Sequence, residues 1–139
     1  SSAASDVYKR QEKGGKTNME EKMKISEAEL EVLQVLWDAE EPLKIQDVCD
    51  RLENKKWKYN TVGTLLLRMA EKGAVVSEKK NRIIYYRPVW EREAYQKEQT
   101  ETLIDRLYHG SAKELAVSLF QGGNMTKEDL EDIRKMFDL

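Results

Sequence analysis

The chain has few of the residues that build disulfides, metal cages and most active sites. Its 139 residues include one cysteine, one histidine and two prolines. A single cysteine, Cys49, excludes an internal disulfide, and a single histidine, His109, disfavours a metal cage. Cys49 stands in an apolar–polar helical pattern, so we interpret it as a packing residue. We expect no cofactor and no bound metal.

Long hydrophobic runs are also missing. No apolar stretch approaches the roughly 20 residues that cross a bilayer, and the N-terminus lacks the apolar segment of a secretory leader. We therefore expect a cytoplasmic protein without membrane insertion. There is no glycine-rich phosphate loop and no nucleophile motif, which favours a binding protein over an enzyme. A hydrophobic content of 40% suffices for one small core.

Charge is distributed unevenly along the chain. The formal net charge is −2, yet residues 55–89 carry a net charge of +7, whereas residues 24–54 sum to −6 and residues 90–139 to −4. A patch of one sign on an otherwise acidic chain is typical of a phosphate-binding surface. The basic residues of this segment are Lys55, Lys56, Lys58, Arg68, Lys72, Lys79, Lys80, Arg82 and Arg87.

The hydrophobic pattern predicts three helices after a tail. Residues 1–23 show no amphipathic period, and we interpret them as a disordered tail that is native only in part. Ser26 and Glu29 form a capping box at the start of the first helix, and a second helix is expected over about 44–52. The third helix is predicted from an N-cap at Asn60 to Lys72, with Gly73 as its C-terminal cap.

A hairpin and three further helices are predicted next. Segments 74–78 and 82–87 have strand composition and are joined by the polar turn Lys79-Lys80-Asn81. Helices are then expected over Trp90–Tyr108, Lys113–Phe120 and Thr126–Phe137. The predicted fold is mainly α with a small β-hairpin: a winged helix-turn-helix domain over 24–89 and a helical dimerisation region over 90–139.

The third predicted helix has two contrasting faces. Its inner face carries Val62, Leu65, Leu66 and Met69. The opposite face carries Thr64, Leu67, Arg68 and Glu71, and Asn60 and Thr61 lie in the exposed first turn. A helix in the major groove needs short polar side chains near its N-terminus for base edges and longer cations for phosphates. The predicted DNA-binding residues are Lys58, Asn60, Thr61, Thr64, Arg68 and Lys72 in and before this helix, and Lys79, Lys80 and Arg82 in the hairpin.

Several motifs resemble a known family. They are Ile25-Ser26-Glu27-Ala28-Glu29-Leu30-Glu31-Val32-Leu33 with Val35-Leu36-Trp37, then Thr61-Val62-Gly63-Thr64-Leu65-Leu66-Leu67-Arg68-Met69, Tyr85-Tyr86-Arg87-Pro88, and the segment 102–111. Together they resemble penicillinase repressors of the BlaI/MecI type over about residues 24–139. The resemblance implies a homodimeric winged-helix repressor of a beta-lactam-resistance or related operon. It also implies binding to a double-stranded dyad operator, and release when a membrane sensor's signal leads to proteolysis.

The chain departs from that family at several positions. The recognition helix of this type often has cations where Asn60 and Gly63 stand and a polar residue where Leu67 stands, so the operator sequence is expected to differ. Ser118-Leu119 occupies the place where staphylococcal repressors are cut between Asn and Phe, and is the candidate cleavage site. The C-terminal cysteine cluster of the related copper-responsive repressors is missing, which argues against copper sensing.

The C-terminal region is predicted to form the dimer interface. Helix 113–120 is apolar over most of its circumference, and exposed apolar patches of this kind usually mark an interface. The predicted interface residues are Leu103, Leu107, Leu115, Val117, Leu119, Phe120, Ile133 and Phe137. Two alternatives to a repressor stay open: a winged-helix module that binds protein, and a ligand-sensing regulator of the multidrug-resistance type. The operator, the regulated genes and the inducing signal are not determined by the sequence.

Overall fold

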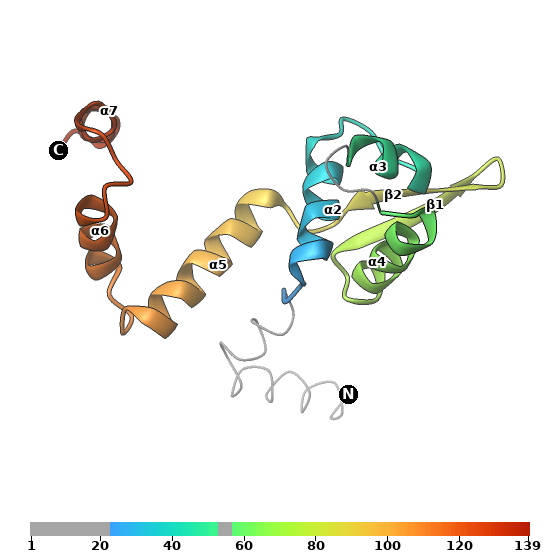
Figure 1. The fold of residues 1–139 in the computed structure, drawn as a ribbon, viewed down its shortest axis with the longest axis horizontal. Coiled ribbons are helices and arrows are strands. Elements are labelled where there is room, and N and C mark those ends of the chain that lie inside the picture. Colours follow the sequence, from blue (N-terminus) through green and yellow to red (C-terminus); the bar gives the residue numbers. More distant parts are fainter. Residues whose placement is uncertain (1–22, 53–56) are drawn as a thin grey trace, which may run out of the picture. The chain divides into compact units, whose positions relative to one another are not determined.

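The computed structural model describes residues 23–52 and 57–139. The chain divides into two compact units, one up to Gln96 and one from Lys97 to Leu139. This boundary falls inside helix α5 (Arg92–Leu107), whereas the sequence placed the end of the DNA-binding domain at residue 89. Figure 1 shows the elements of each unit along the chain.

Three helices form the first part of unit 1: α2 (Glu27–Asp38), α3 (Ile45–Arg51) and α4 (Tyr59–Glu71). The capping box predicted for α2 is present. The Ser26 hydroxyl accepts from the Glu29 N–H at 3.1 Å, and the Glu29 carboxylate accepts from the Ser26 N–H at 3.0 Å. Two backbone donors of the first turn are thereby satisfied.

The hairpin consists of β1 (Val75–Lys80) and β2 (Ile83–Pro88), paired antiparallel with Lys80 opposite Ile83. The turn predicted at Lys79-Lys80-Asn81 is therefore wrong, because Lys79 and Lys80 belong to β1. The two turn residues are Asn81 and Arg82, with φ angles of 52° and 69°. Two-residue turns with positive φ at both positions match the twist of the flanking strands, which favours this shorter turn over a three-residue one.

A short bridge ties the hairpin to the segment between α2 and α3. The N–H of Leu43 donates to the carbonyl of Tyr86 at 2.9 Å, and the N–H of Tyr86 donates back at 2.7 Å. Tyr86 is buried and its neighbour Tyr85 is half-buried. β2 is therefore held on both edges, which fixes the register of the hairpin against the helices.

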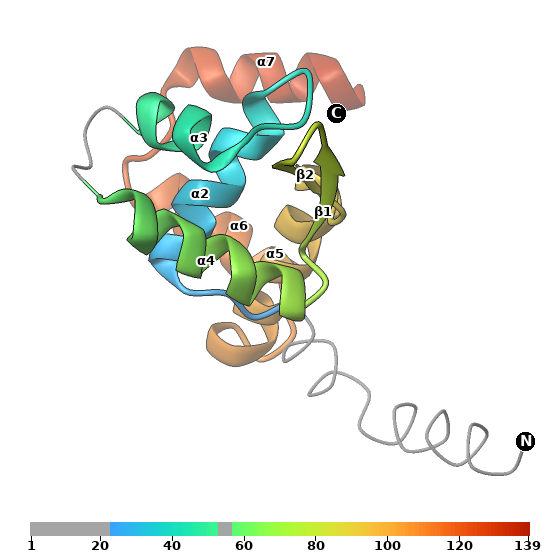
Figure 2. The same ribbon diagram turned by 90° about the vertical axis from the view of Figure 1, so that its right-hand side faces the viewer.

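One hydrophobic core lies between the three helices and the base of the hairpin (Figure 2). Met23, which the sequence assigned to the tail, packs against this core, and so does Trp57. The rest of the predicted tail lies outside the described residues. The buried core residues are Val32, Leu33, Leu36, Leu43, Val48, Val62, Leu65, Leu66, Met69, Ala74, Val75, Tyr86, Trp90 and Tyr95.

An aromatic cluster joins the start of α5 to α2. The Trp37 indole N–H donates to the carbonyl of Trp90 at 2.8 Å, and the rings of Trp90 and Tyr95 stack at 6.1 Å between centroids. The Arg92 guanidinium lies 5.4 Å from the centre of the Trp37 ring and pairs with Asp38. The prediction that the helix starts at Trp90 was wrong by two residues, because Trp90 is buried ahead of the first turn.

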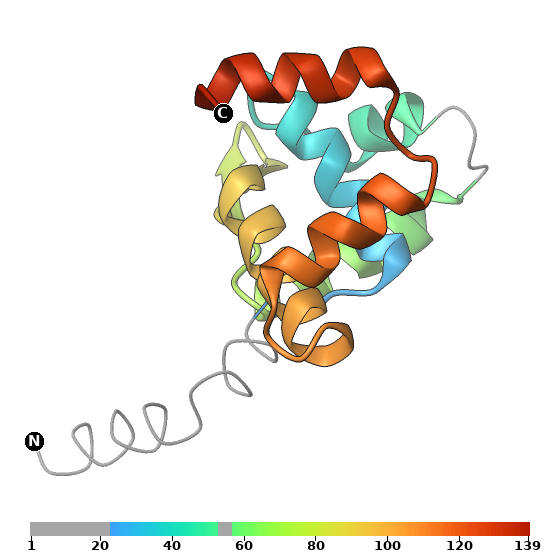
Figure 3. The same cartoon turned by 90° about the vertical axis from the view of Figure 1, so that its left-hand side faces the viewer.

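Unit 2 contains the end of α5, then α6 (Ala112–Gln121) and α7 (Lys127–Phe137), seen in orange and red in Figure 3. Ser111 caps α6, and Thr126 forms the predicted capping box with Asp129. Neither α6 nor α7 contains a buried residue. The described chain therefore has the predicted order of three helices, a hairpin and three helices, but its core lies in unit 1.

Candidate nucleic-acid interface

Helix α4 separates a buried face from an exposed one. Val62, Leu65, Leu66 and Met69 recur at helical spacing and are buried against α2 and α3. The opposite face carries six exposed residues, which we call the reading face: Asn60, Thr61, Thr64, Leu67, Arg68 and Glu71. In Figure 2, α4 and the tip of the hairpin both lie toward the viewer.

The N-terminus of α4 differs from the prediction. The N-cap is Lys58, which makes no side-chain capping bond, and the helix begins at Tyr59. Asn60 therefore lies in the first turn, and the N-cap predicted there was wrong. Its carbonyl accepts a hydrogen bond from the Thr64 hydroxyl at 2.9 Å. Because that bond uses the only hydroxyl proton of Thr64, this side chain offers an outside partner a lone pair and a methyl group.

Lys72, predicted to bind DNA, makes an ion pair inside the unit. Its ammonium donates to Glu29 Oε1 at 2.8 Å, and the Lys72 side chain is 37% exposed whereas that of Glu29 is 5% exposed. Burial by itself would raise the pKa of Glu29. The hydrogen bonds from Lys72 and Ser26, together with the charge of Lys72, outweigh burial and hold the pKa of Glu29 below its usual value. Lys72 therefore neutralises a buried carboxylate.

The basic hairpin residues gather at its tip. Lys79 and Lys80 are the last residues of β1, Arg82 is in the turn, and all three are exposed. Successive residues of a strand point to opposite faces, so Lys79 and Lys80 lie on different sides of the hairpin. At its base, Arg87 lies 3.8 Å from Glu78 across the two strands. Figure 1 shows the hairpin projecting from unit 1.

The predicted site residues therefore form two groups within unit 1. Lys58, Asn60, Thr61, Thr64 and Arg68 are exposed on α4 or at its start, and Lys79, Lys80 and Arg82 are exposed at the hairpin tip. Lys72 belongs to neither group, because its ammonium is paired with Glu29. Lys55 and Lys56 of the basic segment lie outside the described residues.

The family model described as penicillinase repressor matches residues 25–138. The chain belongs to the penicillinase repressor family. Family membership makes it a DNA-binding transcriptional repressor by class, in agreement with its sequence motifs.

The chain shares about a quarter of its aligned residues with other repressors of the family. The penicillinase repressor of Bacillus licheniformis is 24% identical over 114 residues, which cover 82% of this chain and 89% of that protein. The methicillin resistance regulatory protein MecI of Staphylococcus aureus strain N315 is 23% identical over 115 residues, covering 82% and 93%. The solution structure of the DNA binding domain of the repressor BlaI is 34% identical, with a TM-score of 0.47, over 52% of this chain and 88% of that one.

The predicted site left out two exposed hydrophobic residues of α4. Tyr59 is 54% exposed and Leu67 is 57% exposed. The N-cap is two residues earlier than predicted, at Lys58 instead of Asn60, which brings Tyr59 into the first turn. The helical period already placed Leu67 on the face opposite the core, but as an apolar residue it was not counted among the DNA-binding residues. An exposed leucine on a polar face is the unexpected element of this repressor's reading face.

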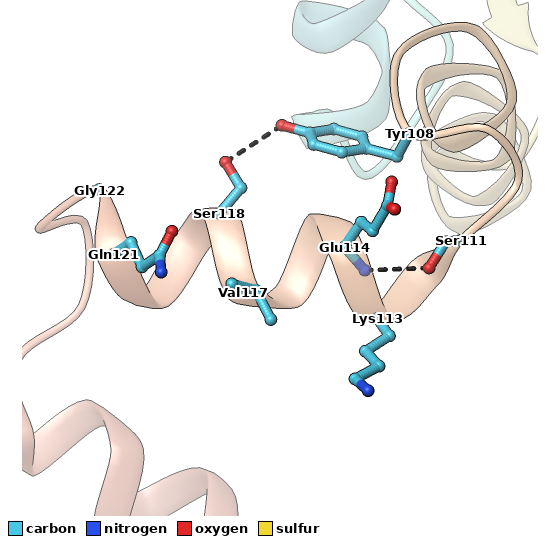
Figure 4. Close-up of a pocket in the computed structure, with 8 residues that line it drawn as sticks. All are labelled: Tyr108, Ser111, Lys113, Glu114, Val117, Ser118, Gln121 and Gly122. Carbon is cyan, nitrogen blue, oxygen red and sulfur yellow. Dashed lines mark hydrogen bonds between the residues drawn. The ribbon is translucent and has the colours of Figure 1, made fainter.

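In unit 2, most predicted interface residues are exposed. Leu103, Leu107, Val117, Leu119, Phe120 and Phe137 are exposed, whereas Leu115 and Ile133 are half-buried. Ser118, at the candidate cleavage site, lies within α6 and its hydroxyl is 3.1 Å from that of Tyr108 (Figure 4). Gly122 and Gly123 follow, and α6 ends there with a positive φ of 71° at Gly123.

Other classes of site find no support in the part of the chain that the structure describes. Within residues 23–52 and 57–139, no helix combines the length and apolar character needed to cross a bilayer. The same residues contain no group of three or more histidine, cysteine, aspartate or glutamate side chains that could hold a metal ion. Cys49 is half-buried. Burial, and to a smaller extent the negative charge of Asp50, raises the pKa of its thiol.

Proposed function

We propose that this chain is a dimeric repressor that binds a dyad operator in duplex DNA through the N-terminal part of α4. The observation that carries the proposal is the division of α4 into a buried apolar face and a reading face with short polar side chains and Arg68. A helix of this kind fits the major groove, where such side chains reach base edges.

Each group of exposed residues has a part in the proposed complex. Asn60, Thr61 and Thr64 approach base edges from the first two turns of α4. Lys58 and Arg68 reach phosphates or a guanine edge. Lys79, Lys80 and Arg82 of the hairpin contact DNA phosphates beside the half-site, which adds affinity without sequence preference. Glu71 limits the contact to the N-terminal part of α4, because a carboxylate on the same face repels phosphate. Lys72 stays paired with Glu29 and does not contact DNA in this proposal.

Dimerisation is proposed from the unpartnered apolar residues of unit 2. Leu107 is 64% exposed, Phe120 51% and Phe137 65%, and neither α6 nor α7 buries any residue within the chain. Exposed apolar surface of this extent usually belongs to an interface. A two-fold dimer would place two copies of α4 on one side of the duplex, at two half-sites about one or more helical turns apart.

Release from the operator is proposed to follow loss of this interface. A dimer joins two weak half-site contacts, and the joined pair can exceed either one by roughly 10²–10⁴. Cutting at Ser118-Leu119 would remove Phe120, Ile133 and Phe137 and leave the reading face intact. The family resemblance supports proteolysis at the end of a membrane-sensor pathway, acting on a cytoplasmic repressor of a beta-lactam-resistance or related operon.

The fold of α6 adds a condition to this mechanism. Ser118 and Leu119 lie inside the helix, and the carbonyl of Ser118 accepts from the N–H of Gly122 at 2.9 Å. Proteolysis favours exposed, locally unfolded segments over intact helices. Cleavage at this bond is therefore proposed to need local unwinding of α6, which would break the bond between Ser118 and Tyr108 as well.

The proposed function is tested with DNA recovered from the organism's own genome by the purified full-length protein. Arg68→Ala should weaken binding of that duplex by about 1–3 kcal/mol, the range for a lost base contact or charge-assisted phosphate contact. Arg134→Ala is the matched control, because Arg134 is exposed on α7 and pairs only loosely with Glu131, at 3.5 Å. It should bind like the unmodified protein.

Two results would count against the proposal. If no duplex is enriched, the result favours the alternative that the winged helix binds a protein rather than DNA. If Arg68→Ala folds normally and binds the recovered duplex as tightly as Arg134→Ala does, Arg68 lies outside the interface and α4 is not the reading helix.

A further inference from the structure

The reading face carries a central stripe whose chemistry changes along the helix. Asn60, Thr64, Leu67 and Glu71 follow one another at spacings of four, three and four residues, so they lie in a row nearly parallel to the axis of α4. From N- to C-terminus the row presents an amide, a threonine, an isobutyl group and a carboxylate. Leu67 is 57% exposed at its centre.

The apolar character of the stripe extends from Leu67 to Thr64. The Thr64 hydroxyl donates its proton to the carbonyl of Asn60, so it cannot donate to a base. Its methyl group and the Leu67 methyl groups are on the same face, one helical turn apart. Leu67 does not contribute to the core, because Leu65, Leu66 and Met69 form the buried side of the same segment.

Only one base edge in the major groove matches such a surface. Thymine presents a 5-methyl group there, whereas guanine, adenine and unmodified cytosine present hydrogen-bonding groups. The cations and amide around Leu67 fit DNA rather than an apolar protein partner, because Arg68 is its neighbour and Lys58, Asn60 and Thr61 lie in the turns before it.

We propose that Leu67, with the methyl group of Thr64, reads thymine 5-methyl groups in the operator half-site. Leu67 is then a specificity-determining residue. Asn60 and Leu67 are seven residues apart, which corresponds to about 10 Å along the helix axis, so in the major groove the two side chains face different base pairs. Each half-site therefore carries thymine within about three base pairs of the position that faces Asn60, because successive base pairs are about 3.4 Å apart along the duplex axis. This inference rests on the proposed function of α4.

The test uses duplexes selected by the full-length protein from a pool of random 30-base-pair DNA. Each thymine of the selected duplex is replaced in turn by deoxyuridine, which removes only the 5-methyl group. Replacement at the Leu67-facing thymine should weaken binding about fourfold per half-site, the effect of losing one buried methyl group. Cytosine at that position should bind less tightly, and 5-methylcytosine should recover part of the loss.

Two variants of similar length separate apolar contact from other effects. Leu67→Met keeps an apolar side chain and should remain sensitive to uracil, whereas Leu67→Gln has a comparable helix propensity and should lose that sensitivity. Both substitutions are at an exposed position, and circular dichroism checks that both variants fold. The two losses should not add: uracil should have little effect on Leu67→Gln.

The possible failures are distinguishable. If the unmodified protein selects no duplex, both the proposed function and the proposed role of Leu67 are refuted. If a duplex is selected but no thymine-to-uracil replacement changes its affinity by more than about twofold, the role of Leu67 is refuted while DNA binding stands. Equal uracil sensitivity in Leu67→Gln and the unmodified protein would also refute it.

Discussion

Replacing Lys72 by methionine should destabilise the fold without weakening contact to DNA phosphates. Methionine has a similar length and helix propensity but no charge. The change leaves the buried Glu29 carboxylate without its ammonium partner, while the N–H of Ser26 still donates to it. The sequence instead predicted that Lys72 binds DNA, so this variant separates the two roles.

The size of the effect follows from the exposure of the pair. Breaking a fully buried ion pair costs about 3–5 kcal/mol, and breaking an exposed one costs about 0.2–1 kcal/mol. Glu29 is buried but Lys72 is 37% exposed, and Glu29 keeps its bond to Ser26. We therefore expect the free energy of unfolding to fall by about 1.5–3 kcal/mol at pH 7, the range for a hydrogen bond to a charged group.

The effect should depend on pH in a defined direction. The pKa of Glu29 is lower in the folded protein than its usual value. The stabilisation is therefore complete above the pKa of the unfolded carboxyl, about 4.3, and is lost as the pH falls through the lower folded pKa. The difference between the unmodified protein and Lys72→Met should accordingly shrink between pH 7 and pH 3.

Urea unfolding followed by tryptophan fluorescence measures this difference. Protein concentration is kept constant, because unfolding of a dimer depends on it. Lys113→Met, at an exposed position in α6, is the matched control and should stay within about 0.5 kcal/mol of the unmodified protein. The double variant Glu29→Gln with Lys72→Met should be more stable than Lys72→Met, because no unpaired charge is left buried.

Three results would refute this reasoning. The first is that Lys72→Met and Lys113→Met have the same free energy of unfolding. The second is that the destabilisation by Lys72→Met is the same at pH 3 as at pH 7. Either result would show that the Lys72–Glu29 ion pair does not stabilise the fold. The third concerns DNA: a log–log salt dependence of operator binding that becomes shallower by about 0.9 would show that Lys72 contacts a phosphate after all.

Two further predictions address the hairpin and the C-terminal unit. Arg82→Gly suits the positive φ of the turn and removes a cation; combined with Lys79→Gln and Lys80→Gln, it should lower affinity for all sequences alike and flatten the salt dependence by about 0.9 per lost phosphate contact. An unchanged slope would place the hairpin away from DNA. A chain truncated after Ser118 should be monomeric in sedimentation at micromolar concentration and bind the operator roughly 10²–10⁴ less tightly. A truncated chain that still dimerises and binds like the full chain would exclude the proposed release mechanism.

Local sequence patterns were sufficient for the number and order of the described helices and for the two faces of α4, although they misplaced the starts of α4 and α5 by two residues each. The capping box of Ser26 and Glu29 uses residues three apart, and the two faces of α4 follow from a period of 3.6 residues. These features depend on neighbours along the chain, so they can be read without knowing the fold. The same holds for Gly73, whose φ of +82° ends α4 where the sequence placed its cap.

Tertiary structure decided what depends on residues far apart in the chain. Lys72 and Glu29 are 43 residues apart, and Trp37 and Trp90 are 53 apart, so no local pattern could pair them. The turn at Asn81-Arg82 was also misplaced from composition. Strand composition is compatible with more than one register, and pairing with Leu43 and the burial of Tyr86 select one of them. Long-range contacts of this kind arise only when α2, α4 and the hairpin pack around one core, and that packing gives Lys72, a predicted DNA contact, a carboxylate partner within the fold.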